Sequence, residues 1–190
     1  MELLQITKSK QRKAMLNLYF ANPEKRFYLR ELEKILRIPV GNVRRELLKL
    51  EKLGLFRMER KGNLTFYSLN QSHPLFSEFK SIITKTSGIP AIIKETLKEF
   101  EGIEDAFLYG SFAKGDEKAD SDVDLFIIGN IDEDRLIRKL RIPEKEVQRE
   151  INYSIFSRDD YEEKLKNEDS FLLSVIRGPK VFLKGSENDL

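Results

Sequence analysis

Residues 106–128 read AFLYGSFAKGDEKADSDVDLFII, and this stretch decides the fold of the second half of the chain. It holds two short apolar runs, at 106–109 and 123–128, separated by a segment rich in glycine, lysine and aspartate. Near-continuous apolar runs of this length are typical of strands buried on both faces. A Gly-Ser pair follows the first run, and an Asp-Val-Asp sequence stands at the start of the second. The pattern predicts two core strands with polar side chains at their ends.

These polar residues are of the types that bind a phosphate and a metal ion. Gly110 lets the backbone pass close to a ligand, and Ser111 can donate a hydrogen bond to a phosphate oxygen. The residues after them can begin a helix whose free N–H groups face that phosphate. A spacing of two on a strand places Asp122 and Asp124 on one face. Two carboxylates facing a bound triphosphate suit Mg²⁺, which prefers carboxylate, phosphate and water. We therefore expect a nucleotide site that uses Mg²⁺ or Mn²⁺.

The whole stretch resembles the signature of the DNA polymerase beta superfamily, and it is most similar to that of the minimal nucleotidyltransferases. That signature is Gly-Ser, about ten residues, then Asp-x-Asp, and the matching residues are Gly110, Ser111, Asp122 and Asp124. Lys114, followed by glycine, stands where many members have Arg-Gly. The resemblance covers about residues 89–185.

The resemblance implies a small mixed sheet with flanking helices and a Mg²⁺-NTP bound at Gly110, Ser111 and Lys114. It also implies that Asp122 and Asp124 are metal ligands and catalytic residues. Members transfer a nucleotidyl group to a hydroxyl on a small molecule, a nucleic acid or a protein. Some minimal members act as antitoxins that adenylylate a partner toxin.

One position departs from the family pattern. Active members usually carry a third carboxylate on the next core strand, which binds metal and helps to deprotonate the nucleophile. Strand alignment places Asn152 there, and an amide is no base and a weak Mg²⁺ ligand. Glu150 lies two residues earlier and would share the strand face if the strand extends that far. Two outcomes stay open: a nucleotidyltransferase with Glu150 as a catalytic carboxylate, or a non-catalytic nucleotide sensor.

Upstream of this stretch the apolar spacing changes to that of short amphipathic helices followed by a hairpin. The expected elements are helices at 10–20, 29–36 and from Pro39 to Gly54, a short strand at 26–28, and a hairpin of strands 55–59 and 64–69 joined by residues 60–63. This order is that of a winged helix. Two further helices are expected between His73 and Phe100.

Two segments of this region resemble winged-helix regulators of the arsenic-repressor and multiple-antibiotic-resistance type. Residues 38–56, IPVGNVRRELLKLEKLGLF, resemble the recognition helix with the turn into the wing, and residues 60–70, RKGNLTFYSLN, resemble the wing. The resemblance covers about residues 10–70 and implies binding to double-stranded DNA.

In a helix-turn-helix, the second helix places its first residues on base edges in the major groove. Asparagine can pair with adenine and arginine with guanine, while arginine also neutralises phosphates. The residues expected to contact DNA are Val40, Gly41, Asn42, Arg44 and Arg45 on the helix, and Arg60 and Lys61 at the hairpin tip. The alternative is a protein-interaction module whose charges are simply a solvated surface.

The charge distribution favours DNA for the front part of the chain. Residues 1–70 hold 16 Lys and Arg against 7 Asp and Glu, whereas the remainder holds 18 against 25. A basic module suits a polyanion, and the acidic remainder argues against nucleic acid covering the whole protein. No cysteine is present, which excludes disulfides and thiolate metal sites. No secretory signal or membrane-spanning stretch is recognisable, so we expect a cytoplasmic protein with no membrane partner.

The sequence thus predicts an α+β protein of two domains. Residues 1–72 are expected to form the winged-helix domain, 73–101 connecting helices, and 102–190 the nucleotidyltransferase-type domain. The leading hypothesis is a DNA-binding regulator that binds Mg²⁺-NTP and transfers a nucleotidyl group to a hydroxyl acceptor. The alternatives are a nucleotide-sensing transcription regulator without catalysis and an antitoxin-like interaction module. A protein acceptor and a homodimer stay open as further partners.

Overall fold

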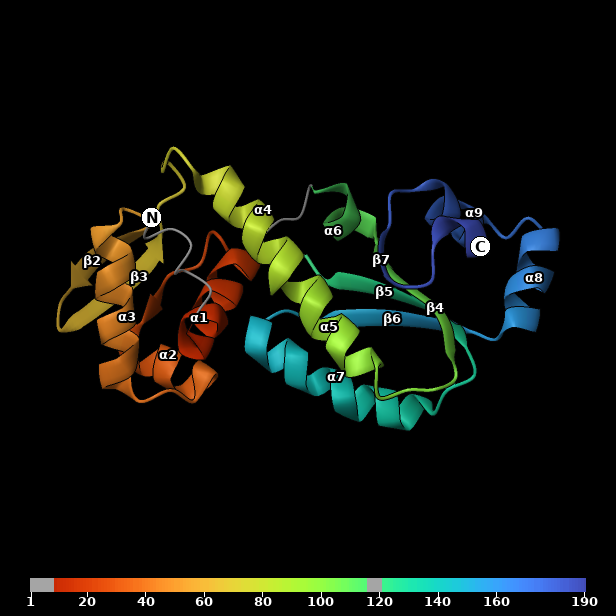
Figure 1. Ribbon diagram of the computed structural model, residues 1–190, viewed down its shortest axis with the longest axis horizontal. Coiled ribbons are helices and arrows are strands. Elements are labelled where there is room, and N and C mark those ends of the chain that lie inside the picture. Colours follow the sequence, from red (N-terminus) through yellow and green to blue (C-terminus); the bar gives the residue numbers. More distant parts are fainter. Residues whose placement is uncertain (1–8, 116–120) are drawn as a thin grey trace. The chain divides into compact units, whose positions relative to one another are not determined.

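A computed structural model describes residues 9–115 and 121–190 (Figure 1). The described residues form two compact units. The first extends to Ile89 and includes Lys145–Gln148, and the second comprises Pro90–Glu144 and Arg149–Leu190. In the part of the chain that is described, no helix combines the length and apolar character needed to cross a bilayer.

The first unit consists of four helices and a small antiparallel sheet among the residues described. Its elements are α1 (Lys10–Ala21), β1 (Phe27–Tyr28), α2 (Leu29–Leu36), α3 (Val40–Lys52), β2 (Phe56–Lys61), β3 (Leu64–Leu69) and α4 (Phe76–Thr86), with strand order β1-β3-β2. The order of elements is the one expected from the sequence. The hairpin differs in one detail, because Arg60 and Lys61 lie in β2 opposite Thr65 and Leu64. Only Gly62 and Asn63 turn the chain, and Gly62 has a φ of 61°.

The core of the first unit is built around Tyr19. Its ring meets those of Phe27 and Phe56 edge-on, with centroids 5.2 and 4.7 Å apart. Its hydroxyl donates to the carbonyl oxygen of Tyr67 at 3.2 Å, and burial raises the pKa of the phenol far above its ordinary value. The helical stripes expected from the sequence point into this core, since Met15, Leu18, Leu32, Val43, Leu47 and Leu50 are all buried. Amphipathic spacing therefore decides how the helices pack.

Helix α3 begins without a side-chain cap of its own, because Pro39 stands at its N-cap position. The free N–H of Val40 instead donates to the carboxylate of Glu33 on α2, at 3.0 Å. Hydrogen bonds from Arg30 and from this N–H lower the pKa of Glu33. The Glu33 carboxylate thus satisfies one of the backbone N–H groups that have no partner within the helix, and its negative charge complements the helix dipole. In this way α2 fixes where α3 starts.

The second unit is a mixed sheet with helices on both faces. Its elements are α5 (Ile89–Leu97), β4 (Ile103–Tyr109), α6 (Gly110–Lys114), β5 (Val123–Gly129), α7 (Glu133–Val147), β6 (Ile151–Phe156), α8 (Arg158–Lys166), α9 (Ser170–Arg177), β7 (Val181–Lys184) and a 3₁₀ turn (Glu187–Asp189). The strand order is β6-β5-β4-β7, with β5 and β6 parallel and the other pairs antiparallel. The expected α+β class is confirmed.

Alternation along the strands divides the core of this unit between the two faces of the sheet. Phe107, Phe126 and Ile128 pack with α8 and α9, and Phe107 and Phe126 stack with centroids 5.1 Å apart. The opposite face, which carries Leu108 and Leu125, is covered by α5 and α7 (Figure 1). The two helices predicted for residues 73–101 are both present. Helix α4 contributes Phe79 and Ile83 to the core of the first unit, and α5 belongs almost wholly to the second.

Candidate functional site

The polar residues singled out in the sequence meet at the ends of three adjacent strands. Asp124 is the second residue of β5 and lies opposite Tyr109, the last residue of β4, on one side. On its other side it lies opposite Asn152 of β6. This register brings the two runs of the 106–128 stretch together as expected, and it places Asn152 where the strand alignment had put it.

Gly110 lies directly against Asp124. Its φ is 68°, and a Cβ added at this residue would stand 2.3 Å from Oδ2 of Asp124. Both the left-handed backbone and the close approach require glycine here. The short helix α6 follows, with Ser111 half-buried in its first turn and Lys114 exposed at its end. Residues 116–120 of the loop that leads to Asp122 lie outside the described residues.

Asp122 lies just before β5 and is exposed. Its Oδ2 accepts a hydrogen bond from Nδ2 of Asn152 at 3.1 Å. Burial, and then the negative charge of Asp122, raise the pKa of Asp124 above its ordinary value. Neither carboxylate forms an ion pair with any Lys or Arg that the structure describes. Two like charges are thus held together by strand geometry, with Asn152 as a neutral neighbour.

Glu150 does not join this pair. Strand β6 begins one residue later, and only the backbone of Glu150 takes part in the sheet, its carbonyl oxygen accepting from the N–H of Val123 at 2.9 Å. The side chain is exposed. Among the described residues, no group of three His, Cys, Asp or Glu side chains is placed to hold a metal ion. Within residues 9–115 and 121–190, the carboxylates brought together at this site are therefore those of Asp122 and Asp124.

Two residues of this region were not singled out in the sequence. Arg149 is 6% exposed and donates through Nε, at 2.8 Å, and through Nη2 to the carbonyl oxygen of Ser121, so it fixes the chain just before Asp122. Burial, and then the charge of Asp124, raise the pKa of Tyr109, while the nearby Ser154 on β6 acts in the opposite direction. An arginine before a strand and a tyrosine within one are ordinary patterns, so nothing in the sequence marks either residue.

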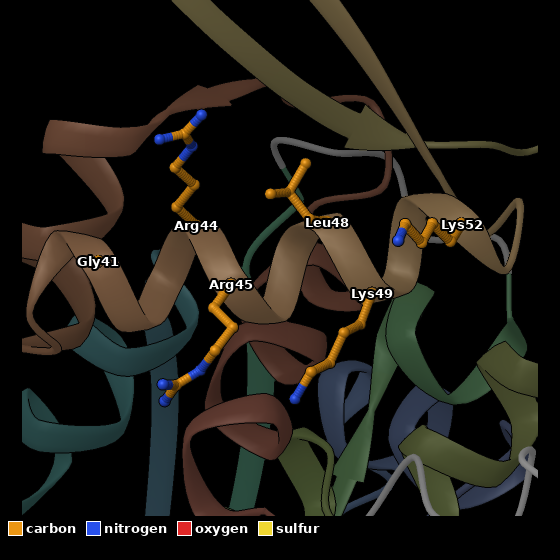
Figure 2. Close-up of a pocket in the computed structure, with 6 residues that line it drawn as sticks. All are labelled: Gly41, Arg44, Arg45, Leu48, Lys49 and Lys52. Atoms are coloured by element: carbon orange, nitrogen blue, oxygen red, sulfur yellow. The ribbon is translucent and has the colours of Figure 1, made fainter.

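The first unit carries a second candidate site on the exposed face of α3. A hollow of about 410 Å³ is lined by Gly41, Arg44, Arg45, Leu48, Lys49 and Lys52 (Figure 2). The polar side chains of this lining are all cationic. Lys49 pairs with Glu46 at 2.9 Å, while Arg45 donates to the Asn42 side chain at 3.1 Å.

The remaining residues expected to contact DNA are spread over α3 and the hairpin. Val40 and Asn42 are half-buried at the start of α3, and Gly41 is exposed beside them. Arg60 and Lys61 are exposed near the end of β2. All seven residues named from the sequence thus belong to the first unit.

Comparison with known proteins identifies the second unit. Residues 91–181 match the family model of the nucleotidyltransferase domain. No curated protein matches the chain.

Three solved structures are similar at low identity. A toxin–antitoxin with AMP-PNP is 14% identical over 53% of this chain and 77% of its own, with a TM-score of 0.40. HlyU from Vibrio cholerae is 18% identical over 45% of this chain and 87% of its own, with a TM-score of 0.37. A Sulfolobus solfataricus protein assigned as a nucleotidyltransferase is 18% identical over 49% of this chain and 73% of its own, with a TM-score of 0.28.

Each of these structural similarities is weak, so the assignment depends on the family match. The matched residues contain the whole cluster at the strand ends, from Gly110 through Asp124 to Asn152. Residues 91–181 therefore form a nucleotidyltransferase domain.

Proposed function

We propose that the second unit binds a nucleoside triphosphate together with Mg²⁺. The observation that carries this proposal is the gathering of Asp122 and Asp124 next to the tight turn at Gly110, within the matched domain. In this proposal the phosphates lie against Gly110 and Ser111, and the two carboxylates hold the metal ion. Mn²⁺ has similar ligand preferences and can replace Mg²⁺.

The residues at the site fit a single hard cation. Burial and like charge make the ionised form of Asp124 unfavourable, and a divalent cation between the two carboxylates offsets that cost. When bound, the metal neutralises charge on the phosphate oxygens. Asn152 offers an amide in place of a third carboxylate, and its nitrogen already donates to Asp122. We therefore propose binding of one metal ion with its nucleotide.

Transfer of the nucleotidyl group is expected to be slow or absent. An acceptor hydroxyl must lose its proton during the attack, and general bases must lie within hydrogen-bond reach of that proton. Asn152 cannot accept a proton, and Glu150 is exposed outside β6. We therefore propose a domain that binds nucleotide but transfers the nucleotidyl group slowly or not at all, because Asn152 replaces the third carboxylate.

The binding proposal is tested by calorimetry of the full chain with Mg²⁺-ATP. Asp122→Asn combined with Asp124→Asn is expected to abolish Mg²⁺-dependent binding. Asp159→Asn combined with Glu163→Gln removes the same charge from the exposed surface of α8 and is expected to leave affinity unchanged. Equal affinity in wild type and in the Asp122/Asp124 variant would refute the proposed site.

The transfer proposal is tested with labelled nucleotide and Mg²⁺ or Mn²⁺, looking for label on the protein or on added acceptors. For a degenerate site, Asn152→Asp restores some transfer and Glu150→Gln changes nothing. For a site in which Glu150 moves in to act, Glu150→Gln removes the activity and Asn152→Asp has little effect. Brisk wild-type transfer that is indifferent to Glu150→Gln would contradict both.

We propose as a second function that the first unit is a winged helix that binds double-stranded DNA. The specific observation in its favour is the cationic hollow on the exposed face of α3. The apolar residues Val43, Leu47 and Leu50 of the same helix are buried in the core, so the helix presents its basic residues to solvent. An exposed basic helix face of this kind suits the major groove. The protein is then a DNA-binding regulator whose second unit senses nucleotide.

Fluorescence anisotropy with labelled duplex DNA tests this function. Wild type is expected to bind with a steep negative dependence on salt, because phosphate contacts release counterions. Arg44→Ala with Arg45→Ala should weaken binding about tenfold or more and reduce the log–log salt slope by up to about 2. Lys10→Ala with Lys85→Ala removes two exposed charges from α1 and α4 and is the matched control.

Two results separate the regulator from an interaction module. A change in DNA affinity on addition of Mg²⁺-ATP supports the sensor, whereas DNA binding that ignores nucleotide leaves the two units functionally independent. Salt-insensitive or absent DNA binding would remove the DNA function and favour a protein partner for the first unit, as in the antitoxin-like alternative.

A further inference from the structure

An exposed aromatic ring stands beside the candidate nucleotide site. Phe171 lies in the first turn of α9 and is 41% exposed, whereas Leu172 and Val175 of the same helix are buried. Its ring packs edge-on against Tyr109, with centroids 6.2 Å apart, and lies 6.5 Å from that of Phe126. Phe171 therefore covers the end of the aromatic core and leaves much of its own surface to solvent.

Tyr109 connects this ring to the carboxylates. It is the last residue of β4, it lies opposite Asp124, and Gly110 follows it directly. On its other side Asp124 lies opposite Asn152 of β6, and Ser154 follows two residues later on the same strand. Because residues two apart on a strand share a face, Tyr109, Asp124, Asn152 and Ser154 belong to the same face of the sheet. Phe171 flanks that face on the side of α9.

We infer that Phe171 is a stacking platform for the base of the nucleotide whose phosphates are bound at Gly110, Asp122 and Asp124. This inference rests on the proposed nucleotide site and adds the position of the base to it. An aromatic ring stacks on any base, because every base has a π-face. Purines offer the larger stacking area, so the site favours a purine nucleoside triphosphate over a pyrimidine one.

A purely structural role would place Phe171 differently. Phe107, Phe126 and Tyr161 are buried in the core of this face, and Phe156 is partly buried against it, stacked on Phe126 with centroids 5.2 Å apart. Phe171 is the more exposed ring, at 41%. It contacts that core from its margin, so truncating it removes less buried surface than truncating Phe107 or Phe126 would. Its loss is therefore expected to change ligand affinity more than folding.

The first experiment separates the base from the phosphates. Full-length protein is titrated with ATP, CTP and inorganic triphosphate, each with Mg²⁺, as wild type and as Phe171→Ala. Phe171→Ala is expected to weaken ATP binding at least about fivefold and to leave triphosphate binding unchanged. Ile142→Ala, at a 58% exposed residue of α7 in the same unit, is the matched control and should alter neither.

The second experiment uses the absence of tryptophan from the chain. Phe171→Trp introduces a single tryptophan at the proposed platform, whose emission is excited selectively over that of the tyrosines, and the larger ring preserves stacking. ATP is expected to quench or shift its emission, whereas inorganic triphosphate leaves it unchanged. Ile142→Trp places the single tryptophan elsewhere on the unit, and its emission should respond to neither ligand.

The outcomes distinguish this inference from the proposed function. If wild type and Phe171→Ala bind ATP with the same affinity, and each binds triphosphate as tightly as ATP, the base does not stack on Phe171. That result would overturn the platform but would leave the metal–phosphate site intact. Absence of binding for all three ligands would overturn the nucleotide site itself, and the platform with it. A Phe171→Ala variant that loses triphosphate as well as ATP would show a structural role and also contradict the inference.

Discussion

Replacing Gly110 by alanine tests whether the close approach of this turn to Asp124 requires glycine. The new Cβ would stand 2.3 Å from Oδ2 of Asp124, whereas ordinary contacts begin at 3.4 Å, so the carboxylate must retreat by about 1 Å. A left-handed backbone costs a non-glycine residue about 1 kcal/mol, and forced packing adds about 1–3 kcal/mol. Gly110→Ala is therefore expected to destabilise the second unit by about 2–4 kcal/mol.

Two comparisons isolate the clash from the backbone strain. Gly115 has a φ of 77°, and no heavy atom of the residues that the structure describes, its chain neighbours aside, lies within 4 Å of an added Cβ, so Gly115→Ala should cost only about 1 kcal/mol. In an Asp124→Ala background the nearest atom left to the new Cβ at 110 is the Cβ of residue 124, at 3.6 Å. Gly110→Ala should then cost about as little as Gly115→Ala, which gives a coupling of about 1–3 kcal/mol between 110 and 124.

Hydrogen exchange measured by mass spectrometry on peptides from β4 and β5 reports the stability of this unit separately from the first. Nucleotide affinity is measured on the same variants, because a displacement of about 1 Å at a ligand can weaken a site strongly. Equal destabilisation by Gly110→Ala in both backgrounds would refute the reasoning, since the cost would then not come from Asp124.

The remaining predictions concern charge. Because the pKa of Asp124 is raised, its ionisation opposes folding: stability falls as pH rises from the unfolded towards the folded pKa. Asp124→Asn should therefore raise the Tm of the metal-free protein at pH 7, with an advantage that shrinks as pH falls through the raised pKa of Asp124 and is gone below the ordinary aspartate value; an unchanged Tm would contradict this. Glu46 is buried, which would raise its pKa, but hydrogen bonds from Lys49 and Arg12 outweigh burial and lower it. Glu46→Gln should destabilise the first unit by about 2 kcal/mol at pH 7, as seen by hydrogen exchange in α3. That contribution should disappear only in acid, as pH falls through the lowered pKa of Glu46.

The sequence predicted most of the local structure because the decisive signals are local. The stripe Val43, Leu47 and Leu50 has helical spacing, and the apolar runs around Phe107 and Phe126 have the length of buried strands. The sequence predicts that the hairpin loop begins at Arg60, because residues 60–63 are basic and turn-like. In the structure the turn begins two residues later, at Gly62. The pairing of Arg60 with Thr65 depends on the two-residue turn at Gly62, which the sequence does not distinguish from a longer loop.

The candidate site could be predicted in part. Asp122 and Asp124 are marked by their spacing after Gly110, and Asn152 by counting along the next strand. Three other features of the site depend on tertiary contacts. These are the hydrogen bond between Asn152 and Asp122, the hydrogen bonds from Arg149 to the carbonyl oxygen of Ser121, and the position of Phe171 beside Tyr109. No spacing rule encodes these contacts, because they join residues that are far apart in the chain.

The strand order of the second unit also has a consequence during synthesis on the ribosome. Strands β4 and β5 pair as neighbours soon after they emerge, but β6 must wait for the crossover through α7, and β7 is the last of the four in sequence. Until Val181–Lys184 has emerged, one edge of β4 has no strand to pair with, and its apolar residues Phe107 and Leu108 stand at that edge. Unpaired apolar edges invite association with other chains. The nascent chain is thus most vulnerable to aggregation between the emergence of β4 and that of β7, and chaperone demand should peak in that interval.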